Sequence, residues 1–139
     1  ADGNLAVPTK PHTDYGALTL LATDGVPGLE VQPISGEWEP VDAPSGSLVV
    51  NIGDMLARWT NDRYRSTPHR VLASTTTHRL SIPFFVNPDP DTTVTPIGND
   101  VTGPARYDPI RAGDYLAARI DGTIEPYAGP APARPAREA

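Results

Sequence analysis

The chain has 139 residues, which is enough for one domain with a modest hydrophobic core. A net charge of −6, without a dense basic cluster, disfavours nucleic acid as a partner, and no apolar run is long enough to span a membrane. The absence of cysteine excludes disulfides, zinc-thiolate sites and a cysteine nucleophile. It is compatible with the reducing cytoplasm, where we expect this protein to be located.

Seventeen prolines and twelve glycines predict short strands separated by turns. In chain order, the expected strands cover residues 18–23, 29–32, 37–41, 47–52, 67–74, 78–86 and 92–97. Residues 55–61 fit either a strand or a helical turn, and residues 114–120 predict one short helix with its N-cap near Gly113 or Asp114. Turn signals about every 8–12 residues are typical of a sandwich or barrel, so we expect an all-β fold. Residues 1–120 would form the domain, and the Ala- and Pro-rich residues 121–139 a largely disordered tail.

The pattern His12-x-Asp14, followed by His69 in a separate strand-like segment, indicates a metal site. Alternate residues of an extended chain point the same way, so His12 and Asp14 would present both donors to one point. Two imidazoles and one carboxylate are the set that holds non-haem Fe(II) on one face and leaves other positions open. A lone His-x-Asp pair is common on surface loops, and only the joint occurrence with His69 gives the motif weight.

Ten residues beyond His69 comes Arg79-x-Ser81 in the expected strand 78–86. A guanidinium group can hold a carboxylate through two hydrogen bonds, and a hydroxyl two residues on can add a third. The period of two places Pro83 and Phe85 on the same face as this pair, so we expect Phe85 to line a substrate cavity, together with Leu18 and Leu20.

Five segments carry a family resemblance, in order and at matching spacing. They are residues 11–21 (PHTDYGALTLL), 28–31 (GLEV), 48–54 (LVVNIGD), 64–71 (YRSTPHRV) and 79–86 (RLSIPFFV). Together they resemble the catalytic C-terminal domain of isopenicillin N synthase-like, 2-oxoglutarate-dependent Fe(II) oxygenases. Residues 106–109 and 113–116 resemble the segment that follows this domain in many members, and the resemblance covers about residues 8–120.

The resemblance implies a double-stranded β-helix, or jelly roll, with one short C-terminal helix. It implies that His12, Asp14 and His69 bind Fe(II), and that Arg79 and Ser81 bind the distal carboxylate of the co-substrate 2-oxoglutarate. The implied reaction is a dioxygenase reaction that oxidises a small organic substrate with O₂ and yields succinate and CO₂. The protein itself would position and shield the reactants.

Two features of the sequence leave alternatives open. Family members carry a long N-terminal half, which we expect to be missing from this chain, and the alternate face of the Arg79 strand (Leu80, Ile82, Phe84 and Val86) is apolar and needs cover. We therefore expect an N-terminal half or an oligomer partner over this outer sheet face. The chain could also be a substrate-only Fe(II) oxidase of the isopenicillin N synthase type, which keeps the Arg-x-Ser for its own substrate. A truncated, inactive metal-binding jelly roll is the third hypothesis, and a cupin-like barrel a weaker fourth.

Overall fold

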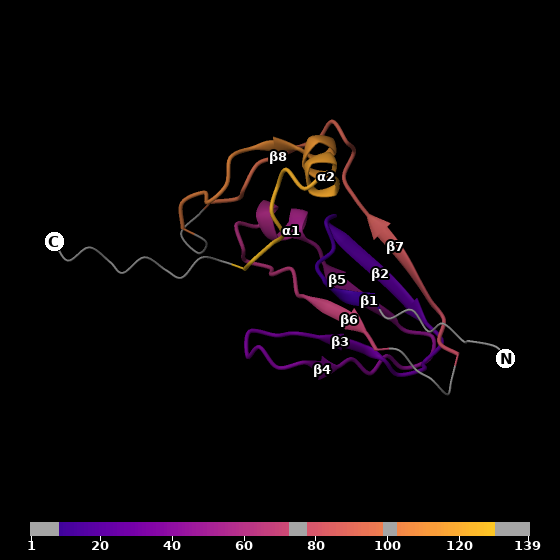
Figure 1. The fold of residues 1–139 in the computed structure, drawn as a ribbon. Coiled ribbons are helices and arrows are strands. Elements are labelled where there is room, and N and C mark those ends of the chain that lie inside the picture. Colours follow the sequence, from indigo (N-terminus) through magenta and orange to yellow (C-terminus); the bar gives the residue numbers. More distant parts are fainter. Residues whose placement is uncertain (1–8, 73–77, 99–102, 130–139) are drawn as a thin grey trace.

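The computed structural model describes residues 9–72, 78–98 and 103–129, and its strands form two facing antiparallel sheets (Figure 1). The four-stranded sheet has the order β1 (Thr9–His12), β6 (His69–Val71), β3 (Leu29–Val31) and β4 (Glu39–Pro40). The three-stranded sheet has the order β5 (Leu48–Ile52), β2 (Leu18–Thr23) and β7 (Ser81–Val86). A two-stranded ladder joins β8 (Thr93–Val94) to β9 (Ile110–Arg111), and the helices are α1 (Asp54–Trp59) and α2 (Ala112–Ile120).

This arrangement confirms the all-β jelly roll with a short C-terminal helix. Within the described ranges, no helix is long and apolar enough to cross a membrane. The expected strand 67–74 is shorter in the structure, and its last two residues lie outside the described ranges. The division at residue 120 stays a prediction, and residues 130–139 of the expected tail also lie outside them.

The segment predicted as strand or helical turn forms helix α1. Helix α2 begins two residues before the expected start, and its N-cap is Arg111 rather than Gly113 or Asp114. The reason is that backbone groups satisfy the first turn: Ala112 donates its N–H to the Thr92 carbonyl at 2.9 Å, and Gly113 donates to the Pro90 carbonyl at 3.0 Å. A side-chain cap is therefore not needed at this helix start.

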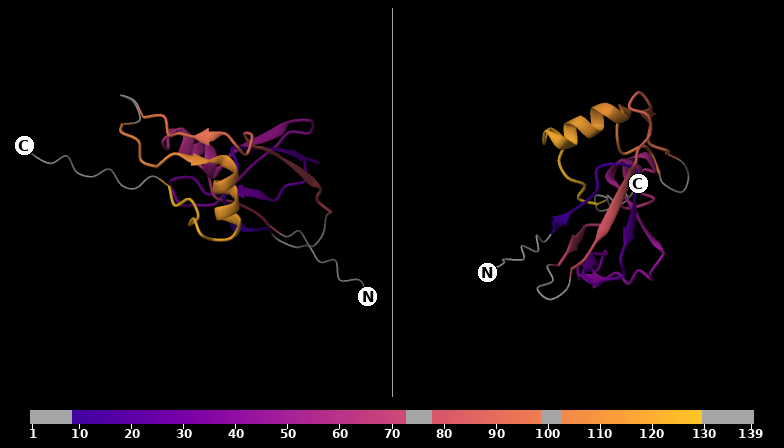
Figure 2. Two further views of the ribbon diagram at one scale, coloured as in Figure 1. Left: turned by 90° about the horizontal axis from the view of Figure 1, so that it is seen from above. Right: turned by 90° about the vertical axis from the view of Figure 1, so that its right-hand side faces the viewer.

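The hydrophobic core lies at one end of the sandwich, where α1, α2 and the β8–β9 ladder meet (Figures 1 and 2). Met55, Val94 and Ala112 are fully buried there, and Tyr115 is nearly so. Burial raises the pKa of Tyr115 to about 12, with a further contribution from nearby Asp54, so its phenol is neutral at pH 7. This core fixes α2 behind the end of the sheets and leaves the space between them for a cavity.

The outer face of the β5–β2–β7 sheet is apolar and open to solvent. Its register places Leu20 between Val50 and Phe84, and Ala22 between Leu48 and Ile82. On the two flanking strands the large side chains of this face are more than half exposed: Leu48, Val50, Ile82 and Phe84. Contiguous apolar surface of this kind marks a face that another element covers.

Candidate metal centre

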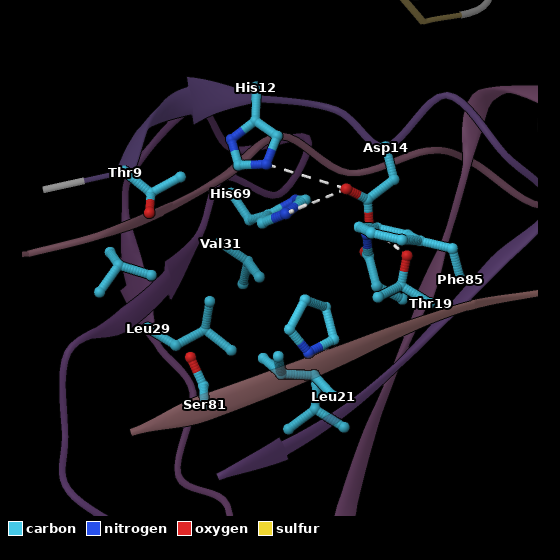
Figure 3. A pocket seen from close by; sticks show the side chains of 14 residues that line it. Thr9, His12, Asp14, Thr19, Leu21, Leu29, Val31, His69, Ser81 and Phe85 are labelled. Carbon is cyan, nitrogen blue, oxygen red and sulfur yellow. Dashed lines mark hydrogen bonds and ion pairs between the residues drawn. The ribbon is translucent and has the colours of Figure 1, made fainter. Parts of the chain in front are cut away.

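His12, Asp14 and His69 meet at the end of the four-stranded sheet (Figure 3). His12 is the last residue of β1 and pairs in register with His69, the first residue of β6. One donor atom from each of the three side chains lies within 4.8 Å of the others. The Nε2 atoms of His12 and His69 lie 3.8 and 3.7 Å from the same carboxylate oxygen, Oδ1 of Asp14. Three donors from two separate segments therefore point to one place.

Asp14 itself is not on a strand, unlike the extended segment that the sequence suggested. It lies in the loop after β1, next to a register shift in the β1–β6 ladder. Its backbone carbonyl accepts a 2.7 Å hydrogen bond from the N–H of Asp54, which fixes the turn of the chain there. The convergence with His12 thus depends on this loop and on the residues that hold it.

The main chain orients both imidazole rings. Nδ1 of His12 lies 2.8 Å from the Lys10 carbonyl, and Nδ1 of His69 lies 3.2 Å from the Thr67 carbonyl. A carbonyl can only accept, so in each bond Nδ1 carries the hydrogen, and in a neutral ring the lone pair is then on Nε2. Hydrogen bonds at the second ring nitrogen are the usual support of a metal-binding histidine.

The two oxygens of the Asp14 carboxylate have different surroundings. Its Oδ2 accepts hydrogen bonds from the Thr19 hydroxyl at 2.6 Å and from the Asn51 amide at 2.7 Å. Its Oδ1 faces the two Nε2 atoms. Asp14 is only 9% exposed, so a negative charge sits beside two lone pairs in a nearly buried position. A bound cation would balance this charge, and two imidazoles with one carboxylate suit Fe(II).

A cavity of about 160 Å³ runs from this cluster between the two sheets. Figure 3 shows the two histidines at one end and Ser81 and Leu21 toward the other. Its walls carry side chains from both sheets: Thr9, Thr19, Leu21, Leu29, Val31, Val49, Asn51, Val71, Ser81, Pro83 and Phe85. The lining is largely apolar with a few convergent polar groups, which is the usual character of a small-molecule site.

Arg79 and Ser81 lie toward the end of the cavity that is opposite the His12–Asp14–His69 group. Nη1 of Arg79 donates to the Ser81 hydroxyl at 2.9 Å, and its Nε donates to the Val26 carbonyl at 3.2 Å. Ser81 lines the cavity that begins at His12, Asp14 and His69, whereas Arg79 lines a second cavity that shares Leu29 with the first. The guanidinium group therefore stands at the boundary of the two cavities, beside the hydroxyl with which it was expected to act.

The start of strand β7 is held by an acid that the sequence did not single out. Asp24 accepts backbone hydrogen bonds from Leu80 at 2.6 Å and from Val26 at 3.0 Å. These bonds, chiefly the one from Leu80, hold the pKa of Asp24 below its ordinary value. Asp24 thus fixes the backbone on both sides of the Arg79 side chain.

Of the expected substrate-lining residues, Phe85 lines the cavity and Leu18 and Leu20 do not. The register of β2 and β7 pairs Phe85 with Thr19, so Thr19 and Leu21 share the cavity face. Leu18 and Leu20 pair with Val86 and Phe84 and lie on the outer face instead. The contact of Phe85 with a substrate stays a prediction.

Thr19 and Asn51, the two residues that donate hydrogen bonds to Asp14, were not predicted from the sequence. Both interrupt apolar runs of their strands, in LTLL and VVNI. A polar residue on the buried face of an otherwise apolar strand is the signal by which they could have been found.

The family model for the 2OG-Fe(II) oxygenase superfamily matches residues 1–88. The chain belongs to this superfamily. Scopoletin 8-hydroxylase of Arabidopsis thaliana is 40% identical over 114 residues, which cover 81% of this chain and 32% of that protein. The 2-oxoglutarate-Fe(II) type oxidoreductase hxnY of Emericella nidulans is 48% identical over 81 residues, or 58% of this chain and 23% of that protein.

Solved structures of the superfamily share the fold. A full-length Neurospora crassa protein in complex with alpha-KG matches with a TM-score of 0.73 and 34% identity, over 84% of this chain and 37% of that one. The dioxygenase for auxin oxidation in rice matches with a TM-score of 0.74 and 39% identity, over 83% and 40%. The chain described here spans about a third of the length of the curated relatives that it matches.

Proposed function

We propose that this chain is the metal- and co-substrate-binding part of a dioxygenase that uses Fe(II), 2-oxoglutarate and O₂ to oxidise a small organic molecule, with succinate and CO₂ as co-products. The observation that carries the proposal is the His12–Asp14–His69 cluster, in which two Nε2 atoms and one carboxylate oxygen face one point. Membership of the 2OG-Fe(II) oxygenase superfamily supports it.

In this proposal His12, Asp14 and His69 hold the iron, which with 2-oxoglutarate and O₂ supplies the oxidising chemistry. The chain's own contribution is orientation. Thr19 and Asn51 direct one Asp14 oxygen away from the metal position and leave the other facing it. The walls of the space between the sheets are largely apolar, and we propose that Phe85 contacts the substrate there.

Arg79 and Ser81 would bind the distal carboxylate of 2-oxoglutarate. A guanidinium group beside a hydroxyl, 2.9 Å apart, offers several donors to one carboxylate. The apolar residues Leu21, Leu29 and Pro83 line the same cavity as Ser81 and suit the methylene groups of a dicarboxylic acid. The names of the relatives support 2-oxoglutarate as the co-substrate over a substrate-only oxidase.

A covering layer for the outer face of the β5–β2–β7 sheet is part of this proposal. The exposed Ile82 and Phe84 support it, and so does the length of the relatives, of which this chain spans about a third. The layer would be a further part of a longer protein or a second subunit. The third hypothesis, a jelly roll that binds metal but is inactive by itself, draws its support from this same open face. We propose the cytoplasm as the location, on the absence of cysteine alone.

Anaerobic titration of the Fe(II)-loaded chain with 2-oxoglutarate tests the proposal. We expect a visible metal-to-ligand charge-transfer band that saturates with 2-oxoglutarate. In Arg79→Ala the band should need far more 2-oxoglutarate, whereas the exposed Arg63→Ala is the matched control and should titrate like the wild type. Metal binding without any such band would contradict 2-oxoglutarate as the co-substrate. Oxygen uptake with no 2-oxo acid present would favour the substrate-only oxidase.

A further inference from the structure

A second carboxylate, that of Asp54, lies buried behind the loop that carries Asp14. Asp54 is the first residue of α1 and is 1% exposed. Its Oδ2 accepts hydrogen bonds from the Thr13 hydroxyl at 3.0 Å and from Nη2 of Arg119 at 2.7 Å. Thr13 is the residue between the two proposed ligands His12 and Asp14. Asp54 therefore forms a hydrogen bond with the residue that connects them.

The backbone around Asp54 holds the same loop. The N–H of Asp54 donates to the Asp14 carbonyl at 2.7 Å, and the N–H of Gly53 donates to the Ala17 carbonyl at 2.9 Å. The approach is so close that a Cβ at Gly53 would lie 2.1 Å from the Gly16 carbonyl oxygen. The junction of β5 and α1 thus packs against the ligand loop, residues 13–17, which joins β1 to β2. Asp54 provides the side-chain hydrogen bond that holds this loop.

The charge of Asp54 is balanced from the other end of the chain. Arg119 lies in the last turn of α2 and is 5% exposed, and its guanidinium carbon lies 4.4 Å from the centroid of the Tyr15 ring. Its Nη1 also donates to the Ile124 carbonyl at 3.2 Å. Arg119 therefore contacts both Asp54 and a residue of the ligand loop. A buried carboxylate holds its position only while such a partner is present.

We propose that Asp54 and Arg119 are positioning residues for the metal centre. Arg119, from helix α2, holds the Asp54 carboxylate in position. Asp54 in turn holds Thr13, and this keeps His12 and Asp14 in the metal-binding arrangement. The inference rests on the proposed assignment of His12, Asp14 and His69 as metal ligands. The superfamily model matches residues 1–88, and Arg119 lies beyond them. One of the two positioning residues therefore lies outside the matched region.

The test uses the 139-residue chain and Co(II), whose visible absorption reports the number and orientation of its ligands. Arg119→Met keeps the aliphatic stem and removes the charge, and Arg119→Lys restores a cation. Thr13→Val removes only the hydroxyl that Asp54 accepts. The control is Arg111→Met, because Arg111 lies just before α2 and, like Arg119, pairs with an acid, but its pair with Asp91 is exposed. Co(II) affinity and the absorption spectrum are measured at a temperature where circular dichroism shows each variant to be folded.

We expect Co(II) affinity to fall about 10-fold or more in Arg119→Met, as for other residues that orient metal ligands, with a changed Co(II) spectrum. Thr13→Val should show a smaller fall with the same spectral change, Arg119→Lys should recover part of the affinity, and Arg111→Met should match the wild type. If Arg119→Met does not fold, Thr13→Val carries the test, because the ion pair stays intact in that variant.

A purely structural role makes a different prediction. Arg119→Met would then lower only the melting temperature, and both affinity and spectrum would stay at wild-type values in Arg119→Met and Thr13→Val, which would overturn the inference. Failure of the wild-type chain to bind Co(II) would instead overturn the metal site itself, and the positioning role with it. The two failures are thus distinguished by the wild-type titration.

Discussion

Asp14 lies in the loop between β1 and β2, and Asp54 lies against the same loop. Each carboxylate accepts a threonine hydroxyl, but their charges are balanced differently. Asp54 shares one oxygen between Thr13 and the buried cation of Arg119. Among the residues that the structure describes, the hydrogen-bond donors to Asp14 are neutral, and its second oxygen faces two imidazole nitrogens. A buried charge that is neutralised within the chain belongs to the scaffold, whereas one that lacks an internal partner is suited to a ligand.

The largest expected effect is on metal binding when Asp14 is replaced. Asp14→Ala removes the one charged donor, so binding of Fe(II) or Co(II) should fall below detection in calorimetric titration. The free energy of unfolding of the metal-free chain should stay the same or rise, because a nearly buried, uncompensated charge has been removed. Strong destabilisation of the metal-free Asp14→Ala chain would contradict the contrast with Asp54.

The opposite effect on the stability of the metal-free chain is expected for Asp54. Asp54→Ala leaves the Arg119 cation buried without its partner, so the free energy of unfolding of the metal-free chain should fall by about 3–5 kcal/mol. Urea denaturation monitored by circular dichroism measures this change. The double variant Asp54→Ala with Arg119→Met removes both charges and should recover a large part of the loss. A single-variant loss within the range of an exposed pair, about 1 kcal/mol or less, would show that the pair is not held as described.

A smaller effect is expected from the donors that orient Asp14. Asn51→Leu and Thr19→Val each remove one hydrogen bond to Oδ2 and should weaken metal binding by roughly 10–100-fold. Thr19→Ser keeps the hydroxyl and serves as the matched control. Equal metal affinity in Thr19→Val and Thr19→Ser would mean that the hydroxyl plays no part in orienting the carboxylate.

The smallest effect concerns a third acid, the exposed Asp24. Because its pKa is lowered in the folded chain, it contributes stability above its unfolded-state pKa, and this contribution is lost as the pH falls through the lower folded-state value. Asp24→Asn should therefore be slightly less stable than the wild type at neutral pH, and the difference should vanish in acid below the folded-state pKa. Urea midpoints measured across this pH range check the sign. A difference that grows toward acid would contradict it.

Most strands could be predicted because turn signals bound their apolar runs. The prediction for β2 has the observed bounds, and those for β3 and β5 are each one residue too long. Strand β1 carries exposed residues and is defined by its pairing with β6, which its own sequence does not show. Helix α1 has six residues, too few for a helical period to be distinguished from a strand.

The residue types indicated the chemistry of the candidate site. They did not indicate which side chains of each strand point into the cavity. The His12, Asp14 and His69 pattern stands out because the donors are chemically specific. The choice between Leu18 with Leu20 and Thr19 with Leu21 depends on the β2–β7 register, and a one-residue change reverses it. The contact of Asp54 with Arg119 joins residues 65 positions apart and has no local signal.

His12 and His69 each form a hydrogen bond with the main chain of their own segment. Each ring is oriented by a carbonyl only two residues earlier, at Lys10 and Thr67, so point mutations leave the acceptor atom in place. A neutral ring oriented in this way needs no tautomer exchange before it binds a cation, because its lone pair is on Nε2. In the proposed metal site, each of the segments 10–12 and 67–69 would therefore orient its own ligand. Cavity walls can diverge toward new substrates, or be redesigned, while these segments keep that orientation.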